Sequence, residues 1–413
     1  MNAPTTPNPG ATGFGPLAGL KVLEMGQLIA GPFAAKTLAD FGADVIKIEP
    51  PAKPDGSGGG DPLRVWRLLK DGTSVWWQVQ SRNKRSLALD LRQPDAQALV
   101  RQLAADSDVL IENFRPGAME SWGLGPDVLL AANPRLVVLR VSGYGQTGPY
   151  RDRPGFGLLG EAMGGMRHLT GEPGRVPVRV GVSLGDTLAA LHGVIGILMA
   201  LHERHTSGKG QVVDVALYEA VFNCMESLLP EHSAFGAVRG PAGSALPGIA
   251  PSNAYPCADG YVLVGGNGDG IFKRLMTAIG RDDLGQDPAL AHNAGRVLRV
   301  QELDAAIGAW TAQRSVADAL LALDAAQVPA GRIYTAADIA ADPHYAARGM
   351  LLQRPQPDGS ALCVPGIVPK LSRTPGAHHR DAPTLGQDTD AVLSGMGLTA
   401  AQIAELRKRG VVQ

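Results

Sequence analysis

The chain has 413 residues, which suits two compact domains or one large domain with a smaller one inserted. Hydrophobic residues make up 45% of the chain and charged residues 19%, with 38 basic against 39 acidic side chains. A net charge near zero excludes a basic nucleic-acid-binding surface or an acidic disordered tail as the main feature, so we expect no nucleic-acid partner.

Residues 1–16, MNAPTTPNPGATGFGP, are predicted to form a disordered leader. They have neither the basic start nor the apolar core of a signal peptide. The most apolar stretch of the chain, 193–201, is too short to span a bilayer. We therefore expect no membrane association and a cytoplasmic location.

Residues 18–143 alternate strand-like and helical patterns. The strand-like runs are 21–25, 43–49, 86–91, 108–114 and 136–145, and the helical stretches include 32–42 and 94–107. Strand, helix and strand at this spacing predict a parallel sheet with right-handed crossovers. Several runs are apolar on both faces, as in strands that helices cover. The pattern predicts an α/β fold, in which ligands usually bind at the carboxyl ends of the strands.

The middle of the chain, 176–229, is the most hydrophobic region and is predicted to form the central core. We expect a strand at 176–180, a long apolar helix over 186–205, a strand at 212–217 and a helix at 218–229. A connector rich in Gly, Pro and Ala follows at about 235–256 and indicates a domain boundary.

A smaller α+β unit is predicted after this connector. It includes a strand at 260–266 and a helix that Ser315 opens, with Asp318 completing a pattern like a capping box. The tail after residue 340 has too little mass to fold alone, so we expect it to return to the first domain. These expectations give a large domain from 17–228 and 335–413, and a smaller inserted domain from 229–334.

Neither a metal site nor a disulfide is indicated. Cys224, Cys257 and Cys363 lie far apart and form no C-x-x-C pair. The histidines do not show the i, i+4 pair around an acid that a zinc-binding helix needs. We therefore predict no metal.

Two glycine-rich corners follow predicted strands. The segment 143–148, GYGQTG, fits G-x-G-x-x-G, but the next residues, PYRDRPG, cannot open the helix that dinucleotide binding requires. A plain turn is the better interpretation there. The corner at 26–32, by contrast, leads into a helix, and its free backbone N–H groups could hold an anion or a carbonyl oxygen.

Ser183 and Asp186 are two candidate nucleophiles at the start of the long apolar helix. Ser183 lies in GVSLG, which matches the G-x-S-x-G elbow of serine hydrolases and also fits a helix N-cap. No oxyanion segment of the HGGG type lies upstream. Asp186 could serve only the helix dipole, but an ionised carboxylate in an apolar, glycine-lined corner is also a competent nucleophile.

Several segments, in order along the chain, form a recognisable set. They include GLKVLEMGQLIAGPFAAKTLADFGADVIKIEPP, NKRSLALDL, ENFRPGAMESWGL, LTGEPGRVPVRVGVSLGD and PTLGQDTDAVL. From about Leu17 to Val392 the chain resembles the class III CoA-transferases, the family of formyl-CoA and carnitine CoA-transferases. The resemblance implies a large doubly wound domain from both chain ends, a smaller inserted domain, and an interlocked homodimer.

The resemblance also implies a mechanism. In that family the acid of the GxxxxD segment before the long helix is the nucleophile, and here that acid is Asp186. It would attack an acyl-CoA to give a mixed anhydride and then an aspartyl-CoA thioester, with coenzyme A as a substrate and no tightly bound cofactor. Backbone N–H groups at 26–31, or in the segment 240–248, would stabilise the oxyanions. The formyl-CoA branch has a run of glycines in the second segment, where this chain has only Gly240, Gly243 and Gly248, so a lid of that type is disfavoured.

Matching to the family predicts the contacts of coenzyme A. They are Ile29, Ala30, Leu89, Arg92, Asn113, Phe114, Arg115 and Phe156. Arg115 is expected to meet a phosphate through its planar guanidinium.

The chain departs from two branches of the family. The formyl-CoA branch has a glutamine where Ile29 stands and arginines where Pro50 and Ser121 stand, so formate and oxalate are disfavoured as substrates. The α-methylacyl-CoA racemases have a catalytic histidine where Phe156 stands, and without that base proton exchange at the α-carbon is hard to run.

Arg167, Arg175 and Arg179 precede Asp186 in sequence. Each could hold the distal carboxylate of a dicarboxylate such as succinate, or could be a solvated surface charge. We predict a CoA-transferase with succinyl-CoA as the donor. A racemase-like enzyme, a serine acyl-CoA hydrolase that uses Ser183, and a non-catalytic acyl-CoA binder are the alternatives.

Overall fold

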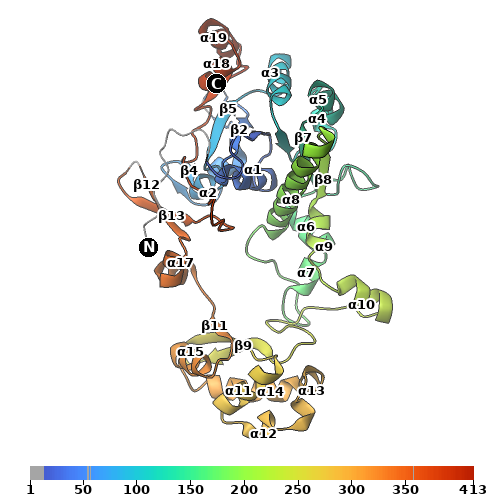
Figure 1. The fold of residues 1–413 in the computed structure, drawn as a ribbon, viewed down its shortest axis with the longest axis vertical. Helices are drawn as coiled ribbons and strands as arrows, with labels where there is room; N and C mark the ends of the chain where they lie inside the picture. Colours follow the sequence, from blue (N-terminus) through green and yellow to red (C-terminus); the bar gives the residue numbers. More distant parts are fainter. Residues whose placement is uncertain (1–13, 54, 56, 357) are drawn as a thin grey trace. The chain divides into compact units, whose positions relative to one another are not determined.

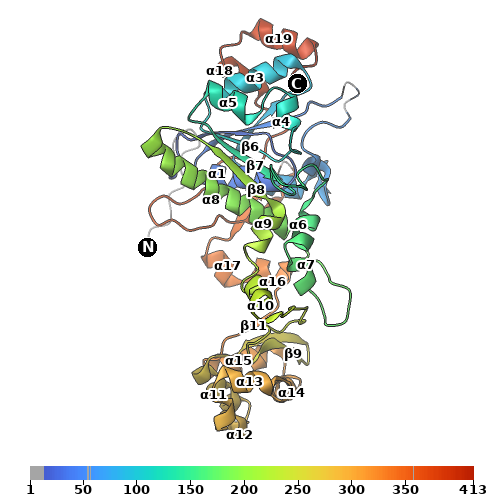
Figure 2. The same ribbon diagram turned by 90° about the vertical axis from the view of Figure 1, so that its right-hand side faces the viewer.

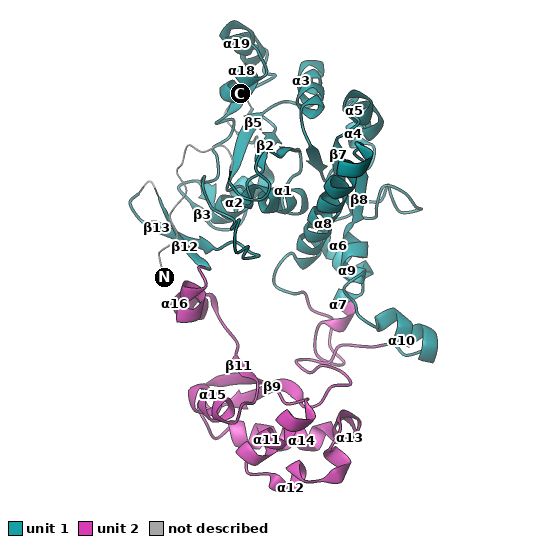
Figure 3. Cartoon of the chain, in the orientation of Figure 1, with its two compact units in different colours: residues 1–167, 180–238, 350–413 teal, residues 168–179, 239–349 magenta. Residues whose placement is uncertain are grey.

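The computed structural model describes residues 14–53, 55, 57–356 and 358–413 (Figure 1). The chain forms two compact units (Figure 3). Unit 1 comprises Met1–Arg167, Val180–Val238 and Met350–Gln413, and unit 2 comprises His168–Arg179 and Arg239–Gly349. Residues 1–13 of the predicted leader lie outside the described residues.

A six-stranded parallel sheet forms the centre of unit 1. Its strands are β1 (Lys21–Glu24), β2 (Asp44–Glu49), β5 (Lys84–Ala88), β6 (Val109–Glu112), β7 (Val137–Ser142) and β8 (Val212–Ala216). Their order across the sheet is β5-β2-β1-β6-β7-β8, and each neighbouring pair is parallel. The strands β6 and β7 are buried along their whole length because helices cover both faces. The predicted α/β fold with a parallel sheet is confirmed.

Helices form a layer on each face of this sheet (Figure 2). The helices α1 (Ala30–Asp40) and α8 (Leu184–Ser207) pack on one face. The other face is covered by α3 (Pro94–Ala105), α5 (Pro126–Ala132), α18 (Thr389–Gly395) and α19 (Ala400–Lys408). The strand order reverses between β1 and β6, so the carboxyl ends of these two strands form a topological switch point, where α/β folds bind ligands.

Shorter elements complete unit 1. They are η1 (Pro62–Val65), β3 (Leu69–Lys70), β4 (Thr73–Ser74), α2 (Val75–Gln80), α4 (Ala118–Ser121), α6 (Gly157–Met163), α9 (Leu217–Phe222), α10 (Leu228–Phe235), β12 (Leu351–Pro355) and β13 (Ala361–Pro365). The short helix α7 (Met166–Leu169) crosses the limit between the units.

The helix α8 is longer than the apolar stretch 193–201 that the sequence singled out. Within the described part of the chain it is the one helix whose length and composition would allow it to cross a membrane. Its Ala189, Val194 and Ile197 lie in the core between the helix and the sheet. In this structure α8 therefore serves as a core helix of unit 1.

Unit 2 contains a three-stranded antiparallel sheet of order β11-β10-β9. Its strands are β9 (Ser252–Cys257), β10 (Gly260–Gly265) and β11 (Ala330–Arg332). Its helices are α11 (Asp269–Ala278), α12 (Asp282–Gly285), η2 (Pro288–Leu290), α13 (Asn293–Leu298), α14 (Val300–Thr311), α15 (Val316–Ala325), α16 (Ala336–Ala341) and α17 (Pro343–Ala347). Phe272, Leu303 and Leu323 are buried in its core.

The predicted cap of α15 is confirmed, and it gives a test of unit 2. The Ser315 hydroxyl accepts a hydrogen bond from the Asp318 backbone N–H at 3.1 Å. We expect Ser315→Ala to lower the free energy of unfolding by about 1 kcal/mol, because that N–H loses its partner. Urea denaturation of variant and wild type measures the difference, and equal midpoints would contradict the role of the cap.

Two predicted elements were wrong. Residues 176–180 form no strand, because Pro177 lacks a backbone N–H and the neighbouring Val176 is exposed. The helix predicted over 218–229 is two helices, α9 and α10, because the chain breaks at Glu226, which adopts a positive φ of 50°.

The limits of the two units differ from the boundaries expected near residues 229 and 334. The helix α10 lies in unit 1, where Leu228 contacts the backbone at Gly165. The helix α16 lies in unit 2, where Asp338 forms an ion pair with Arg332 of β11 at 2.9 Å. The boundary predicted near residue 229 therefore precedes the limit by one short helix, α10, and contacts made by α16 extend unit 2 beyond residue 334.

Candidate active site

The switch point brings two of the expected coenzyme A segments together. The loop after β1 and the loop after β6 are joined by Asn113, whose side-chain oxygen accepts from Gln27 N at 2.7 Å and whose amide donates to Gln27 O at 2.9 Å. A Cβ on Gly26 would lie only 3.0 Å from Gly31 Cα, so the loop needs glycine here. Ile29 and Ala30 therefore lie, like Asn113, at the edge of the sheet where the carboxyl ends of the strands meet.

The remaining expected contacts differ in how accessible they are. Phe114 is half-buried and packs edge-on against Trp122 at 5.1 Å between ring centroids, while Arg115 is exposed. Phe156 is 63% exposed. These three side chains are available to a ligand at the surface of unit 1.

Leu89 and Arg92, the two expected contacts that follow β5, already interact with other residues of the protein. Leu89 is completely buried and its backbone bridges Val412, so a ligand can reach no part of its side chain. The guanidinium of Arg92 is exposed but donates to Asp90 at 2.8 and 3.0 Å. They also lie two strands from β1, because β5 is an edge strand.

The half-buried Asp186 stands in the first turn of α8. Its carboxylate lies directly against the backbone of Gly157, the first residue of α6. A Cβ on Gly157 would lie 2.7 Å from Asp186 Cγ and closer still to Oδ2. The absence of a side chain at residue 157 is therefore what makes room for the Asp186 carboxylate.

The glycine motif at 143–148 takes part in this arrangement. A Cβ on Gly143 would lie 2.9 Å from Gly155 Cα, so the two glycines close the loop between them. This contact places Phe156 and Gly157 next to the start of α8. The motif is a close backbone approach, as its interpretation as a plain turn suggested.

Two residues of this corner were missed from the sequence. Gly157 and Glu161 are four residues apart on α6 and face the first turn of α8. Glu161 is buried, and its Oε1 accepts a hydrogen bond from Gly185 N at 3.5 Å. The i, i+4 spacing was visible in the sequence, but nothing there indicated that this face of α6 meets Asp186.

Ser183 does not have the surroundings of a nucleophile elbow. It is the N-cap residue of α8, although its side chain makes no capping hydrogen bond. The elbow requires a strand directly before the serine, and residues 176–182 contain none. The G-x-S-x-G match therefore lacks its structural context.

A buried carboxylate lies beneath the expected coenzyme A segment 113–115. Glu112 accepts from Arg140 Nε at 2.7 Å and from Phe114 N at 2.7 Å. Burial raises the pKa of Glu112 to about 7, although hydrogen bonding and the charge of Arg140 oppose the shift. Arg140 also forms an ion pair with Glu120 at 2.8 Å, so its charge is shared between two acids.

This raised pKa predicts a pH dependence of stability. Since folded Glu112 holds its proton more tightly than an unfolded glutamate, its contribution is full below pH 4.5 and is lost as the pH rises through 7, by up to about 3 kcal/mol. In Glu112→Gln, urea denaturation at several pH values should show a smaller fall in unfolding free energy over this range. Equal slopes in variant and wild type would contradict it.

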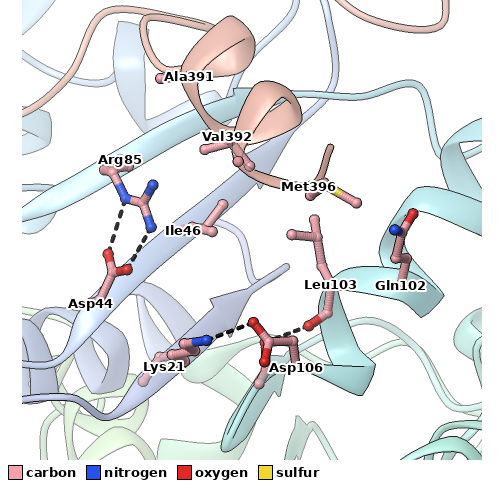
Figure 4. A pocket seen from close by; sticks show the side chains of 13 residues that line it. Lys21, Asp44, Ile46, Arg85, Gln102, Leu103, Asp106, Ala391, Val392 and Met396 are labelled. Carbon is pink, nitrogen blue, oxygen red and sulfur yellow. Dashed lines mark hydrogen bonds and ion pairs between the residues drawn. The ribbon is translucent and has the colours of Figure 1, made fainter. Parts of the chain in front are cut away.

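A surface pocket of about 370 Å³ lies at the opposite, amino-terminal edge of the sheet (Figure 4). Its charged residues are paired with each other: Lys21 contacts Asp106 at 2.6 Å, and Arg85 contacts Asp44 at 2.5 Å. Since Lys21 and Asp44 begin β1 and β2, this pocket is separate from the switch point.

The three arginines expected to hold a distal carboxylate fall in different units. Arg167 lies in unit 1, with Nη1 3.9 Å from Glu161 Oε2. Arg175 and Arg179 are exposed residues of unit 2. Within unit 1, Arg167 is therefore the member of the three that approaches the Asp186 corner through Glu161.

Comparisons with known proteins identify the same family over most of the chain. A family model described as CoA-transferase family III matches residues 17–389. A succinyl-CoA–D-citramalate CoA-transferase of Chloroflexus aurantiacus is 47% identical over 96% of this chain and 98% of that protein. A succinate–glutarate CoA-transferase of Agrobacterium fabrum is 34% identical over 92% and 95%. The crystal structure of a CAIB/BAIF family protein from Brucella suis has a TM-score of 0.79 and 35% identity, covering 93% of this chain and 100% of that one.

Proposed function

The chain belongs to CoA-transferase family III and is a CoA-transferase, and from this premise we propose that it works through an aspartyl-CoA thioester at Asp186. The observation that carries the proposal is the corner formed by α6 and α8, where the backbone of Gly157 leaves room for the Asp186 carboxylate. A half-buried carboxylate next to backbone that carries no side chain can be approached by the flat carbonyl group of a thioester.

The reaction begins with the attack of an Asp186 oxygen on the thioester carbonyl of the donor. The C–S bond breaks, giving a mixed anhydride and CoA thiolate. The thiolate attacks the aspartyl carbonyl, and the donor acid leaves as a carboxylate while aspartyl-CoA forms. The acceptor carboxylate attacks this thioester, a second anhydride forms, and the thiolate takes the acceptor acyl group and frees Asp186.

Each of these attacks builds an oxyanion, which needs hydrogen-bond donors already in place. In our proposal the backbone of 26–31, in the same unit as Asp186, supplies them through N–H groups other than those of Gln27 and Leu28, which already donate to Asn113 and Asp61. This segment begins α1, whose first N–H groups have no partner within the helix.

Coenzyme A is proposed to lie along the switch point. Asn113 and Phe114 line its path, and the exposed Arg115 meets a phosphate. Ile29 and Ala30 are buried, so their contact is proposed through the backbone. For Leu89 the proposal is limited to the backbone, since its side chain is buried. Arg92 would have to give up its ion pair with Asp90 in order to bind a phosphate of coenzyme A. Phe156 would cover the end of coenzyme A that lies nearest Asp186.

Succinyl-CoA is the proposed donor and a dicarboxylate the proposed acceptor. Support comes from the named substrates of relatives, which include D-citramalate and glutarate together with succinate or its CoA thioester. Arg167, next to Glu161, is the proposed partner of the distal carboxylate.

We also propose that the protein forms a homodimer of interlocked subunits, with domains near the limits predicted from the sequence. We further propose a cytoplasmic location, where the free Cys224, Cys257 and Cys363 would stay reduced.

The proposal is tested by trapping the intermediate. Purified protein is incubated with succinyl-CoA, treated with hydroxylamine or borohydride, and digested for peptide mass spectrometry. Modification at Asp186 is the expected result. An unmodified Asp186 peptide in a preparation that transfers CoA would refute the aspartyl intermediate, and a panel of other acyl-CoAs separates a wrong donor from a lack of turnover.

A further inference from the structure

The loop from Gly26 to Pro32 is attached to side chains of unit 1 through six of its backbone polar groups. The attachments are Lys47 Nζ to Gly26 O at 2.8 Å, Asn113 to Gln27 N and O, Asp61 to Leu28 N at 3.0 Å, Gln80 Nε2 to Ile29 O at 3.0 Å, and Lys84 Nζ to Pro32 O at 2.8 Å. Side chains from five different places in the sequence thus converge on seven residues.

Three of these attachments, through Lys47, Asp61 and Lys84, belong to a network of charges, in which Lys84 pairs with Glu24 Oε2 at 2.7 Å. Lys47 is fully buried, and its ammonium group meets Glu24 Oε1 at 2.7 Å, Asp61 Oδ2 at 2.9 Å and Gly26 O at 2.8 Å. These three acceptors match its three N–H donors. Burial alone would lower the pKa of Lys47, but the charges of Asp61 and Glu24 raise it above its ordinary value. Lys47 therefore stays charged.

Asp61 connects this network to the loop. Its Oδ1 accepts from Leu28 N at 3.0 Å and from Leu63 N at 2.9 Å, and Leu28 N also donates at 3.1 Å to Oδ2, the oxygen that meets Lys47. Burial acts to raise the pKa of Asp61, but Lys47 and the backbone donors lower it overall. Leu28 has a positive φ of 62°, which a leucine adopts only when its surroundings hold it there.

We propose that Asp61, supported by Lys47, is a positioning residue that holds Leu28 in this conformation and so fixes Ile29 and Ala30 for coenzyme A. The inference rests on the proposed function for the role of Ile29 and Ala30. Replacing a buried ion pair by apolar residues is often neutral or stabilising, so this pair is better explained by what it specifies than by stability. The ion pair between Asp61 and Lys47 fixes the path of the loop 26–32 at the switch point.

Asp61→Asn is the sharpest variant. An asparagine has one acceptor oxygen, so its NH₂ group must face either the Lys47 ammonium or the N–H of Leu63, and in both cases the arrangement that holds Leu28 is disrupted. Gln80→Leu is a milder second variant that is expected to fold, because Ile29 O keeps its hydrogen bond from Phe33 N at 2.7 Å.

Asp40→Asn is the matched control. Asp40 is also buried and paired with an arginine, Arg82 at 2.6 Å, but it has no contact with the loop among those the structure describes.

Two measurements are made on the full-length protein, well below the unfolding temperature of each variant. Hydrogen exchange followed by mass spectrometry, on a peptide covering 26–33, is expected to be faster by about tenfold or more in Asp61→Asn and by less in Gln80→Leu. The kcat/KM for succinyl-CoA should fall by roughly 10- to 100-fold in Asp61→Asn, mainly through KM. Asp40→Asn should leave both near wild type, even where its unfolding temperature falls as much.

Unchanged exchange and kcat/KM in folded Asp61→Asn would overturn the inference, as would equal changes in Asp40→Asn. If the wild-type protein transfers no CoA from any donor, the proposed function fails. The exchange measurement still decides in that case whether Asp61 holds the loop.

Discussion

Asp186→Asn is expected to lower the rate of CoA transfer by about 10⁴-fold or more, because it removes the nucleophile that forms both covalent intermediates. Asparagine has nearly the same size as aspartate, so the packing against Gly157 is preserved. Transfer from succinyl-CoA to D-citramalate or glutarate, followed by chromatography of the CoA esters, measures the rate. The intact mass of the variant should also show no CoA adduct.

Ser183→Ala is the matched control for this experiment. Ser183 stands three residues before Asp186 and its side chain makes no capping hydrogen bond to α8, so its loss should leave transfer at the wild-type rate. Loss of transfer in Ser183→Ala with transfer retained in Asp186→Asn would instead assign the nucleophile to Ser183. Activity retained in both would refute catalysis by either residue.

Gly157→Ala is expected to lower activity strongly, although it adds only one methyl group. The added Cβ would overlap Asp186 Oδ2, so either the carboxylate or the start of α6 must move. A displacement of this kind at a reacting group costs about 10²-fold in rate, and the overpacking costs about 1–3 kcal/mol of stability. Steady-state kinetics and urea denaturation measure the two effects separately.

Gly308→Ala offers a comparison with the same chemical change. Gly308 lies inside α14, and a Cβ there meets nothing within 4 Å. This variant should keep full activity and gain up to about 1 kcal/mol from helix propensity. If Gly157→Ala were as active as Gly308→Ala, the Asp186 carboxylate could not depend on the close approach of the α6 backbone.

The sheet of unit 1 could be predicted because its strands carry their signal locally. The runs that became β1, β2, β6 and β7 are short, apolar on both faces and separated by helical periods, which is the pattern of a parallel sheet under two helical layers. The strand at 176–180 failed for a local reason too, since Pro177 interrupts an apolar alternation that otherwise reads as β-structure.

The candidate site could be predicted only in part. Asp186 was assigned by resemblance, since an acid in the first turn of a helix ordinarily serves the helix dipole. The burial of Leu89 depends on Val412, more than 300 residues away, and the contact of Gly157 with Asp186 depends on how α6 packs. Such long-range contacts leave no trace in the periodicity of a single chain.

The closing bridge between Leu89 and Val412 has a consequence for synthesis of the protein. Val392, Leu393, Ile403 and Val412 complete the core on one face of the sheet of unit 1, beside residues that are made some 300 positions earlier. During synthesis, part of this apolar face therefore stays uncovered until the last helices leave the ribosome. During this interval the nascent chain is most exposed to aggregation, and holdase chaperones would act on that open face.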